Sequence, residues 1–316
     1  MRFLSLLALC SFLIVSPRIA FADGQSCKTV RLGYVDWTDV RVTTAVAEQL
    51  LTKLGYQVNV SEYTVDTIYQ QLADNKLDAF LGTWMPSNSG AVGPYLEKGS
   101  VKFIKTNLEG ARYTLAVPDY VYQQGIRSVA DIAAHADRFE SRIYGLEKGN
   151  DGNALVQKMI TRNDFGLKNF KLIETSERLM LAQVKGRVKR GEWIAFLAWE
   201  PHPMNTTFKI EYLAGADDYF GPNYGRAVVN TTTREKLMDD CPNLGQFLSN
   251  LTFTVEMEQS IMDQVLNGFI PVERAVSMWL EKNPMQVNQW LAGVSDLAGK
   301  PADHLHVTSS VADSSR

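Results

Sequence analysis

The sequence predicts an α/β protein with two lobes, each a sheet flanked by helices. Short apolar segments typical of buried strands alternate with amphipathic segments typical of helices, as in βαβ units. The same alternation begins again near residue 112, which indicates a second lobe. At 316 residues the chain is long enough for two domains of medium size.

The first lobe is predicted from three strands and the helices between them. Val42, Val46, Leu50 and Leu54 recur at four-residue spacing, which predicts a helix over Val42–Leu54 that ends at Gly55. A shorter helix is expected around Ile68 and Leu72. The expected strands are residues 28–35, 56–60 and 77–81.

The second lobe repeats the pattern, and the last helices are expected to return to the first lobe. Its strands are expected at residues 112–117, 142–146, 170–174 and 193–199. A last strand at 227–230 precedes five helical segments between residues 234 and 292. The lobes are expected to be joined by crossovers near 107–112 and 220–226. We therefore assign 27–111 with 224–297 to lobe 1, 112–223 to lobe 2 and 298–316 to a flexible tail.

The first 22 residues are typical of a signal peptide. Arg2 precedes the apolar run LLALCSFLIV, and Ala20-Phe21-Ala22 is a small-residue cleavage site. No later apolar run is long enough to cross a bilayer. The sequence thus predicts an exported protein, cleaved near Ala22, in a bacterial periplasm.

Two cysteines, Cys27 and Cys241, remain after the predicted cleavage. An even pair in an exported chain predicts one disulfide, although two buried free thiols are the alternative. The bridge would tie the start of the mature chain to a segment far along it.

Motifs for most kinds of chemistry are missing. There is no GxGxxG after a strand, no P-loop, no GxSxG and no CxxC, and the four histidines are scattered. The net charge of −3 includes no basic block for nucleic acid. We therefore expect no cofactor, no metal site and no nucleic-acid partner, and no catalytic residue stands out.

Three tryptophans stand at the ends of predicted strands. Trp37, Trp84 and Trp199 follow or close the strands of YVDW, FLGTW and AFLAW. In an open α/β sheet, ligands bind outside the carboxyl ends of the strands. Packing is the simpler interpretation of any one indole, but three at equivalent positions favour a shared ligand site. Tyr113, beside a crossover, borders the same cleft.

Indole and phenol faces without a basic group suit a quaternary ammonium ion. The ring quadrupole attracts a cation by about 0.5–2 kcal/mol per ring, with more in desolvated sites. A sugar would also stack on indoles, but it would require more polar neighbours than these segments provide.

The motifs VDWTD, LGTWMP, ARYTLAVP, GNDGN, AFLAWEPH and YFGPNYGRAVV resemble the periplasmic substrate-binding proteins of ABC transporters for glycine betaine, proline betaine and choline. The resemblance covers residues 27–295 and is strongest to the choline-binding members. It implies a hinge-closing type II binding protein and a Cys27–Cys241 disulfide. It also implies an aromatic box and two polar ligand contacts, which are Trp37, Trp84, Tyr113 and Trp199 with Asp39 and Asn150.

The polar residues favour choline over betaine. Asp39 would accept a hydrogen bond from the choline hydroxyl and repel the betaine carboxylate. Asp39 is equally typical of a helix cap or first turn, and Asn150 of a turn. Arg112 and His202 are the donors that could instead hold a betaine carboxylate. Acetylcholine lacks the hydroxyl donor and should bind more weakly than choline.

The predicted protein is therefore a monomer that captures choline in an ABC uptake system and docks on an inner-membrane permease. Glycine betaine or proline betaine binding is the alternative. Two other classes stay open, which are a ligand-sensing module and a periplasmic choline-ester hydrolase. A hydrolase would need a nucleophile and a base at the box, and the sequence shows no such pair.

Overall fold

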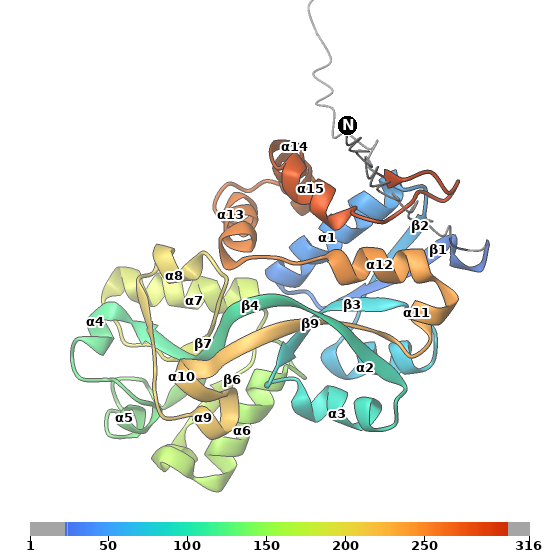
Figure 1. Cartoon of the computed structure of the whole chain (residues 1–316). Helices are drawn as coiled ribbons and strands as arrows, with labels where there is room; N and C mark the ends of the chain where they lie inside the picture. The colour runs from blue at the N-terminus through green and yellow to red at the C-terminus, as the bar shows by residue number, and fades with distance from the viewer. Residues whose placement is uncertain (1–22, 24, 303–316) are drawn as a thin grey trace, which may run out of the picture.

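The computed structural model describes residue 23 and residues 25–302 (Figure 1). The expected signal peptide, 1–22, and residues 303–316 of the expected tail lie outside them. Within the described part, no helix combines the length and apolarity that crossing a membrane requires.

The strands form one hydrogen-bonded sheet in the order β2-β1-β3-β9-β4-β7-β5-β6, with β8 paired to β4. Their bounds are β1 (Thr29–Tyr34), β2 (Gln57–Glu62), β3 (Ala79–Met85), β4 (Val101–Pro118), β5 (Arg142–Tyr144), β6 (Lys171–Ile173), β7 (Phe196–Glu200), β8 (Ile210–Tyr212) and β9 (Arg226–Arg234). Strands β1–β3 are parallel to one another and form the first strand group. Strands β5–β7 are likewise parallel and form the second.

Two long antiparallel strands connect the groups. The first part of β4 pairs with β9, and its last part pairs with β7, so one strand belongs to both halves of the molecule. The crossover expected at 107–112 is therefore the middle of a continuous strand, and the two sheets expected from the sequence are hydrogen-bonded into one. Apolar periodicity identified only residues 112–117 because the earlier part of β4 is partly exposed.

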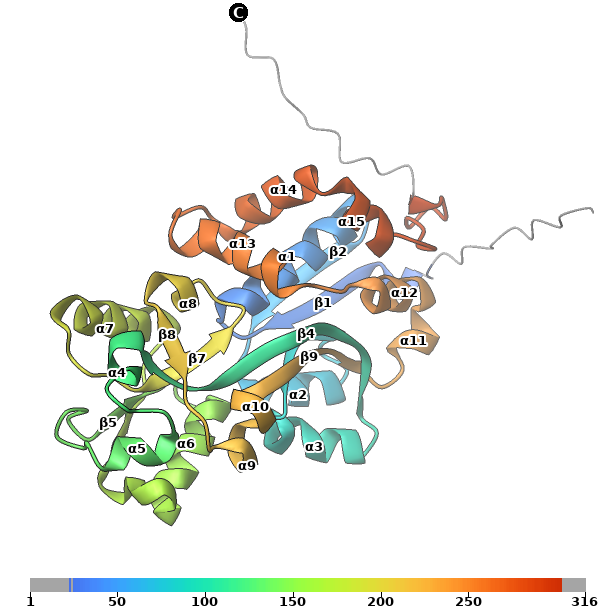
Figure 2. The ribbon, with the colours of Figure 1, turned by 60° about the vertical axis from the view of Figure 1, so that its left-hand side comes forward.

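Helices cover both faces of each strand group (Figures 1 and 2). In the first half they are α1 (Thr38–Lys53), α2 (Val65–Ala73) and α3 (Ser89–Glu97). In the second they are α4 (Asp119–Tyr122), α5 (Val129–Ala133), α6 (Asp151–Arg162), α7 (Glu177–Arg190), α8 (Met204–Thr207), α9 (Asp217–Phe220) and α10 (Pro222–Gly225). After β9 come α11 (Leu237–Asp240), α12 (Pro242–Asn250), α13 (Val255–Leu266), α14 (Val272–Lys282) and α15 (Pro284–Trp290).

The last helices pack against helix α1 of the first half and against β4. Helices α13 and α14 contact α1, whose Val42, Val46 and Leu50 are buried on the predicted face. Helix α1 begins four residues before the predicted Val42, because its first turn is polar and leaves no apolar pattern. The predicted disulfide is confirmed, since Cys27 and Cys241 are bonded with their Cα atoms 5.7 Å apart.

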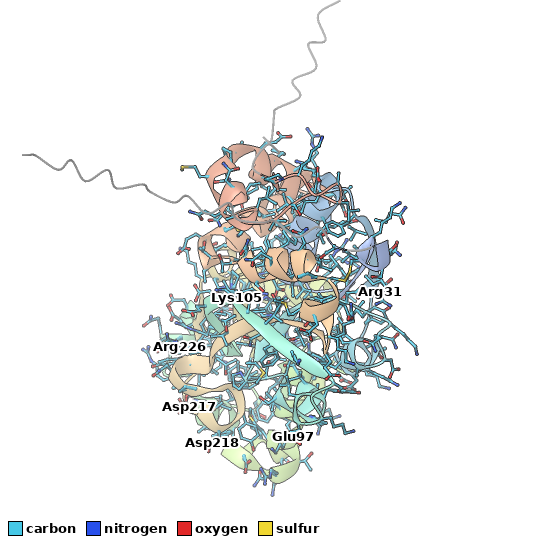
Figure 3. The ribbon with its side chains drawn as sticks, turned by 45° about the vertical axis from the view of Figure 1, so that its right-hand side comes forward. Arg31, Glu97, Lys105, Asp217, Asp218 and Arg226 are labelled. Carbon is cyan, nitrogen blue, oxygen red and sulfur yellow. A yellow bond between two sulfur atoms is a disulfide. The ribbon has the colours of Figure 1, made fainter. Side chains whose placement is uncertain are left out.

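A buried carboxylate ties β9 to the first strand group. Asp78, directly before β3, pairs with Arg31 of β1 at 2.8 Å and with Arg234 of β9 at 2.9 Å. Arg31 is labelled at the right of the view in Figure 3. Burial alone would raise the pKa of Asp78, but hydrogen bonds from the two guanidinium groups lower it below its usual value. The ion pairs hold the far end of the connecting strand.

The first residues of the expected tail are not loose. The backbone N–H of Ala302 donates to the carbonyl of Val294, and the Ala302 side chain is buried. Residues 298–302 therefore fold back onto the body, which corrects the expected boundary at 298. Sequence analysis missed this because the segment is polar and has no periodic pattern.

Candidate functional site

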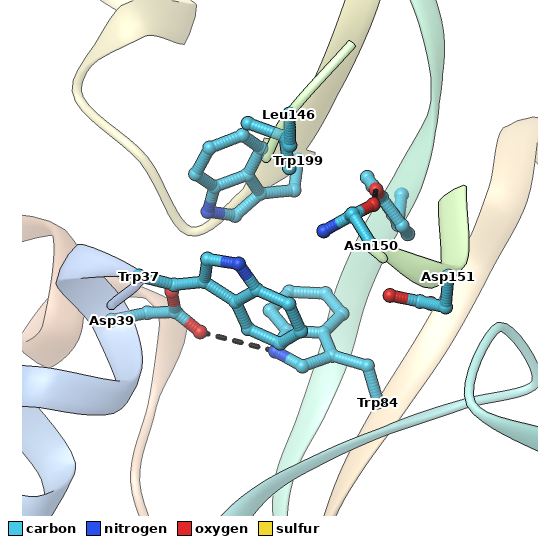
Figure 4. A pocket seen from close by; sticks show the side chains of 8 residues that line it. Trp37, Asp39, Trp84, Leu146, Asn150, Asp151 and Trp199 are labelled. Carbon is cyan, nitrogen blue, oxygen red and sulfur yellow. Dashed lines mark hydrogen bonds between the residues drawn. The ribbon is translucent and has the colours of Figure 1, made fainter. Parts of the chain in front are cut away.

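A small cavity, with a volume of about 20 Å³, lies between the two strand groups (Figure 4). All six residues that the sequence predicted for the site line it, together with two more. The full lining is Trp37, Asp39, Trp84, Tyr113, Leu146, Asn150, Asp151 and Trp199. The structure thus brings the six residues together, and their contact with a ligand remains a prediction.

The ends of the parallel strands place the three tryptophans. Trp84 is the next-to-last residue of β3, Trp199 is the next-to-last residue of β7, and Trp37 comes between β1 and α1. All three are buried. Because β3 and β7 belong to different strand groups, the indoles meet only where the groups face each other.

Tyr113 stands between two of the indoles. It pairs with Trp199 in the register of β4 and β7, and their ring centroids lie 6.5 Å apart at 85°. The Trp84 ring lies 6.2 Å from Tyr113 at 62°. At such steep angles the electropositive edge of one ring meets the electron-rich face of its neighbour, so the rings brace one another in the cavity lining.

Asp39 is the first-turn acid that one interpretation of its sequence predicts, and it also lines the cavity. It lies in the first turn of α1, and its carboxylate also faces the cavity, where Oδ2 accepts a hydrogen bond from Trp84 Nε1 at 3.0 Å. Burial, strengthened by the charge of Glu177, raises the pKa of Asp39 to about 7 against the effect of that hydrogen bond.

Asn150 is the cap of a helix as well as part of the cavity wall. Its Oδ1 accepts from the backbone N–H groups of Gly152 and Asn153 at the start of α6. The same oxygen accepts from the Tyr113 hydroxyl at 3.0 Å, and Nδ2 donates to Glu147 Oε1 at 3.1 Å. Asn150 is thus a helix cap rather than only a turn residue, and it also orients Tyr113.

Asp151 is a cavity residue that sequence analysis missed. Both carboxylate oxygens are buried without a hydrogen-bond partner, and Figure 4 shows the carboxyl group turned toward the cavity. Burial raises the pKa of Asp151 to about 6, and the Ser87 hydroxyl partly offsets this without reaching hydrogen-bonding geometry. The signal was present in GNDGN, as an acid directly after Asn150 at a helix start, but its burial depends on the opposite half of the molecule.

The cavity lining carries two carboxylates and no cationic side chain. The donors considered for a betaine carboxylate are engaged elsewhere. Arg112 lies over the Tyr212 ring, 4.9 Å from its centroid. His202 is buried, with its ring nitrogens bonded to Glu177 and to the backbone N–H of Met204. Buried carboxylates without a partner favour a cation in the space they face.

Gly152 makes room for Tyr113. A Cβ at this position would overlap the Tyr113 hydroxyl and crowd its ring. We expect Gly152→Ala to lower the free energy of unfolding by about 1–3 kcal/mol, the usual cost of overpacking. Chemical denaturation of both proteins measures this.

Gly93 in α3 provides the matched control, since an added methyl there meets nothing within 4 Å. Gly93→Ala should leave stability unchanged or raise it. Equal stability of the Gly152→Ala and Gly93→Ala proteins would contradict the close contact between Gly152 and Tyr113.

A cavity enclosed between two α/β halves defines the class of bilobal binding proteins. A family profile described as the substrate binding domain of ABC-type glycine betaine transport systems matches residues 28–282. The chain belongs to this family.

Solved structures and one relative agree with this assignment. The chain is 45% identical to an ABC-transporter choline-binding protein in complex with choline, with a TM-score of 0.86 over 88% of this chain and 96% of that one. An ABC-transporter choline-binding protein in an unliganded semi-closed conformation is also 45% identical, with a TM-score of 0.81 over 87% of this chain and 96% of that one. A stretch of 154 residues, 49% of this chain, is 50% identical to an uncharacterized protein ORF1 of Chromohalobacter salexigens and covers 96% of it. The predicted type II binding-protein fold is thus confirmed, in a family of transport proteins rather than enzymes.

Proposed function

We propose that this protein captures choline for an ABC uptake system, with the ammonium group inside the aromatic box of Trp37, Trp84, Tyr113 and Trp199. One observation carries the proposal. Four aromatic rings and two buried carboxylates line one cavity that holds no cationic side chain. A quaternary ammonium ion supplies the missing charge and needs no hydrogen-bond acceptor.

The attractions of the aromatic rings and the carboxylates for a cation are large enough for tight binding. Each ring face attracts a desolvated cation by about 2 kcal/mol or more. Asp39 and Asp151 add attraction that solvent screens little at this depth. The matched structure at 45% identity holds choline, which supports the same ligand class here.

Choline fits the charges better than glycine betaine does. A betaine carboxylate would lie near Asp39 or Asp151 with no guanidinium, ammonium or imidazolium in the lining. The choline hydroxyl can donate to Asp39, and the Asn150 amide lines the same cavity. Acetylcholine loses that donor and is bulkier than choline, so it should bind more weakly in this small cavity.

Binding is proposed to close two lobes, 27–111 with 224–297 and 112–223. Trp37, Asp39 and Trp84 belong to the first, whereas Tyr113, Asn150 and Trp199 belong to the second. Since each lobe holds part of the site, the closed form binds ligand better than the open form, and ligand shifts the population toward closure. The protein is proposed to work as a periplasmic monomer that presents this closed form to its permease.

The cavity suits binding better than catalysis. None of its eight lining residues is a serine, threonine or cysteine that could attack a choline ester. Hydrolysis of acetylcholine by the pure protein would contradict this view. If the protein were a ligand-sensing module with a signalling partner in place of a permease, the proposed ligand would be the same.

Isothermal titration with choline and with glycine betaine in the same buffer tests the proposal. We expect choline to bind at least about a hundredfold more tightly, the effect of placing a carboxylate beside buried acids. Tight betaine binding with weak choline binding would show that backbone amides or a rearranged Arg112 hold a carboxylate. No heat from either ligand would overturn the proposed function.

A further inference from the structure

The Glu177 carboxylate receives three hydrogen bonds in a buried position behind the cavity wall. Its oxygens accept from the backbone N–H of Thr38 at 3.0 Å, from the Thr38 hydroxyl and from His202 Nε2 at 3.2 Å. Glu177, Thr38 and His202 are all buried, and Glu177 and His202 are not among the residues that line the cavity.

The three hydrogen-bond donors favour the charged form of the Glu177 carboxylate. His202 Nδ1 accepts from the backbone N–H of Met204 at 2.9 Å, so the ring proton is on Nε2 and points at Glu177. Glu177 is also the first residue of α7, where the helix dipole favours a negative charge. Burial alone would raise the pKa of Glu177, but the bonds from His202 and Thr38 lower it below its usual value.

These bonds join segments from the two halves of the site. Thr38 begins α1 and stands between Trp37 and Asp39. His202 contacts the Trp199 ring, with centroids 4.8 Å apart. Glu177 therefore links the cavity segment of the first strand group to that of the second.

We infer that Glu177 is a positioning residue that holds the cleft closed through Thr38, without touching the ligand. The inference rests on the proposed function. His202 and Glu177 lie in the same half and stay together when the cleft opens, whereas Thr38 must leave. The Glu177–Thr38 bonds thus exist only in the closed form, and they are a differential contact that favours it.

The two bonds from Thr38 shift the balance toward closure whether or not ligand is present. Their main effect is on release, because dissociation requires opening, and differences in affinity between related complexes are mostly differences in off-rate. The bond from Trp37 Nε1 to Glu147 Oε1, at 2.9 Å, also joins the halves. Because Trp37 lines the cavity, a substitution there would change ligand contact as well as closure. A substitution at Thr38 tests closure alone.

Stopped-flow tryptophan fluorescence with choline tests the inference on a matched pair of variants. Thr38→Val keeps the shape of the side chain and removes the hydroxyl donor, whereas Thr38→Ser keeps the donor. We expect choline to dissociate about tenfold faster from Thr38→Val, the value of a hydrogen bond to a charged group. The association rate should change little, and Thr38→Ser should behave like the wild type. Glu177→Gln should also release choline faster.

Small-angle scattering without ligand gives a second readout. The ligand-free Thr38→Val protein is expected to be more open than the ligand-free wild type. An unchanged off-rate in Thr38→Val, or the same loss in Thr38→Ser, would overturn the inference, as would identical ligand-free scattering. Failure of the wild type to bind choline would instead contradict the proposed function, and the scattering comparison would still test whether the Glu177–Thr38 bonds favour closure.

Discussion

Trp199→Leu is expected to weaken choline binding about thirtyfold or more. Leucine keeps an apolar side chain in the wall but removes the ring quadrupole, which contributes about 2 kcal/mol or more to a desolvated cation. The indole N–H of Trp199 has no hydrogen-bond partner, so the substitution breaks no bond within the protein. Trp199→Phe retains a ring and should lose much less. Isothermal titration measures all three proteins.

Trp193→Leu is the matched control. Trp193 precedes the same strand at its other end, is equally buried and packs on Phe139 with centroids 5.2 Å apart. Its indole N–H also has no partner. This variant should be less stable than the wild type but should bind choline as tightly. If Trp193→Leu and Trp199→Leu reduced affinity equally, Trp199 would be a packing residue only.

Asp39→Asn is expected to reduce choline affinity about a hundredfold, because removing one partner of a buried charge pair costs about 3–5 kcal/mol and Asp151 retains part of the attraction. The amide can still accept the bond from Trp84 Nε1, so the wall should keep its shape. Asp36→Asn serves as control, since Asp36 is exposed and pairs with Arg41 at 3.2 Å. Equal affinity of the Asp39→Asn and wild-type proteins would show that the cation does not depend on this carboxylate.

The same carboxylate makes choline binding depend on pH. Burial raises the pKa of Asp39 to about 7 in the ligand-free cavity. A bound cation favours the charged form and lowers that pKa, so binding at neutral pH should release protons. Affinity should therefore be highest above pH 7 and should fall by up to about tenfold per pH unit below it, with a further contribution from Asp151, whose pKa is about 6.

Titrations in buffers of different ionisation enthalpy measure this proton release directly. In the Asp39→Asn protein, the change of affinity near pH 7 should disappear, whereas the change near pH 6, which Asp151 causes, should remain. A pH-independent affinity in the wild type between pH 6 and 8 would contradict the assignment of both carboxylates to the cation site.

Much of the site could be predicted before the structure, for a local reason. A strand is a short apolar run, and the residues just past its carboxyl end can be identified from the sequence. Trp37 lies just past such an end, and Trp84 and Trp199 are next-to-last in their strands; parallel strands bring their carboxyl ends to one edge of a sheet. The helix face of Val42, Val46 and Leu50 is predicted by its spacing in the same way.

Other site features depend on groups far apart in the chain. Asp151 is an ordinary acid in a first helical turn until the opposite half covers its oxygens. Glu177 and Thr38 are 139 residues apart, and no local pattern connects them. The role of β4 in both strand groups depends on its pairing with β9 and β7, which partly exposed residues do not reveal.

The sequence by itself predicted the α/β class, the three tryptophans at strand ends, the disulfide pair and a cationic ligand, because each expectation rests on residue type, residue count or local spacing. Only the tertiary structure decided which carboxylates are buried, which donors are engaged and how the halves are held together. Burial and hydrogen bonding between distant segments exist only when the chain is folded, and they set the pKa of Asp39 and the partners of Glu177.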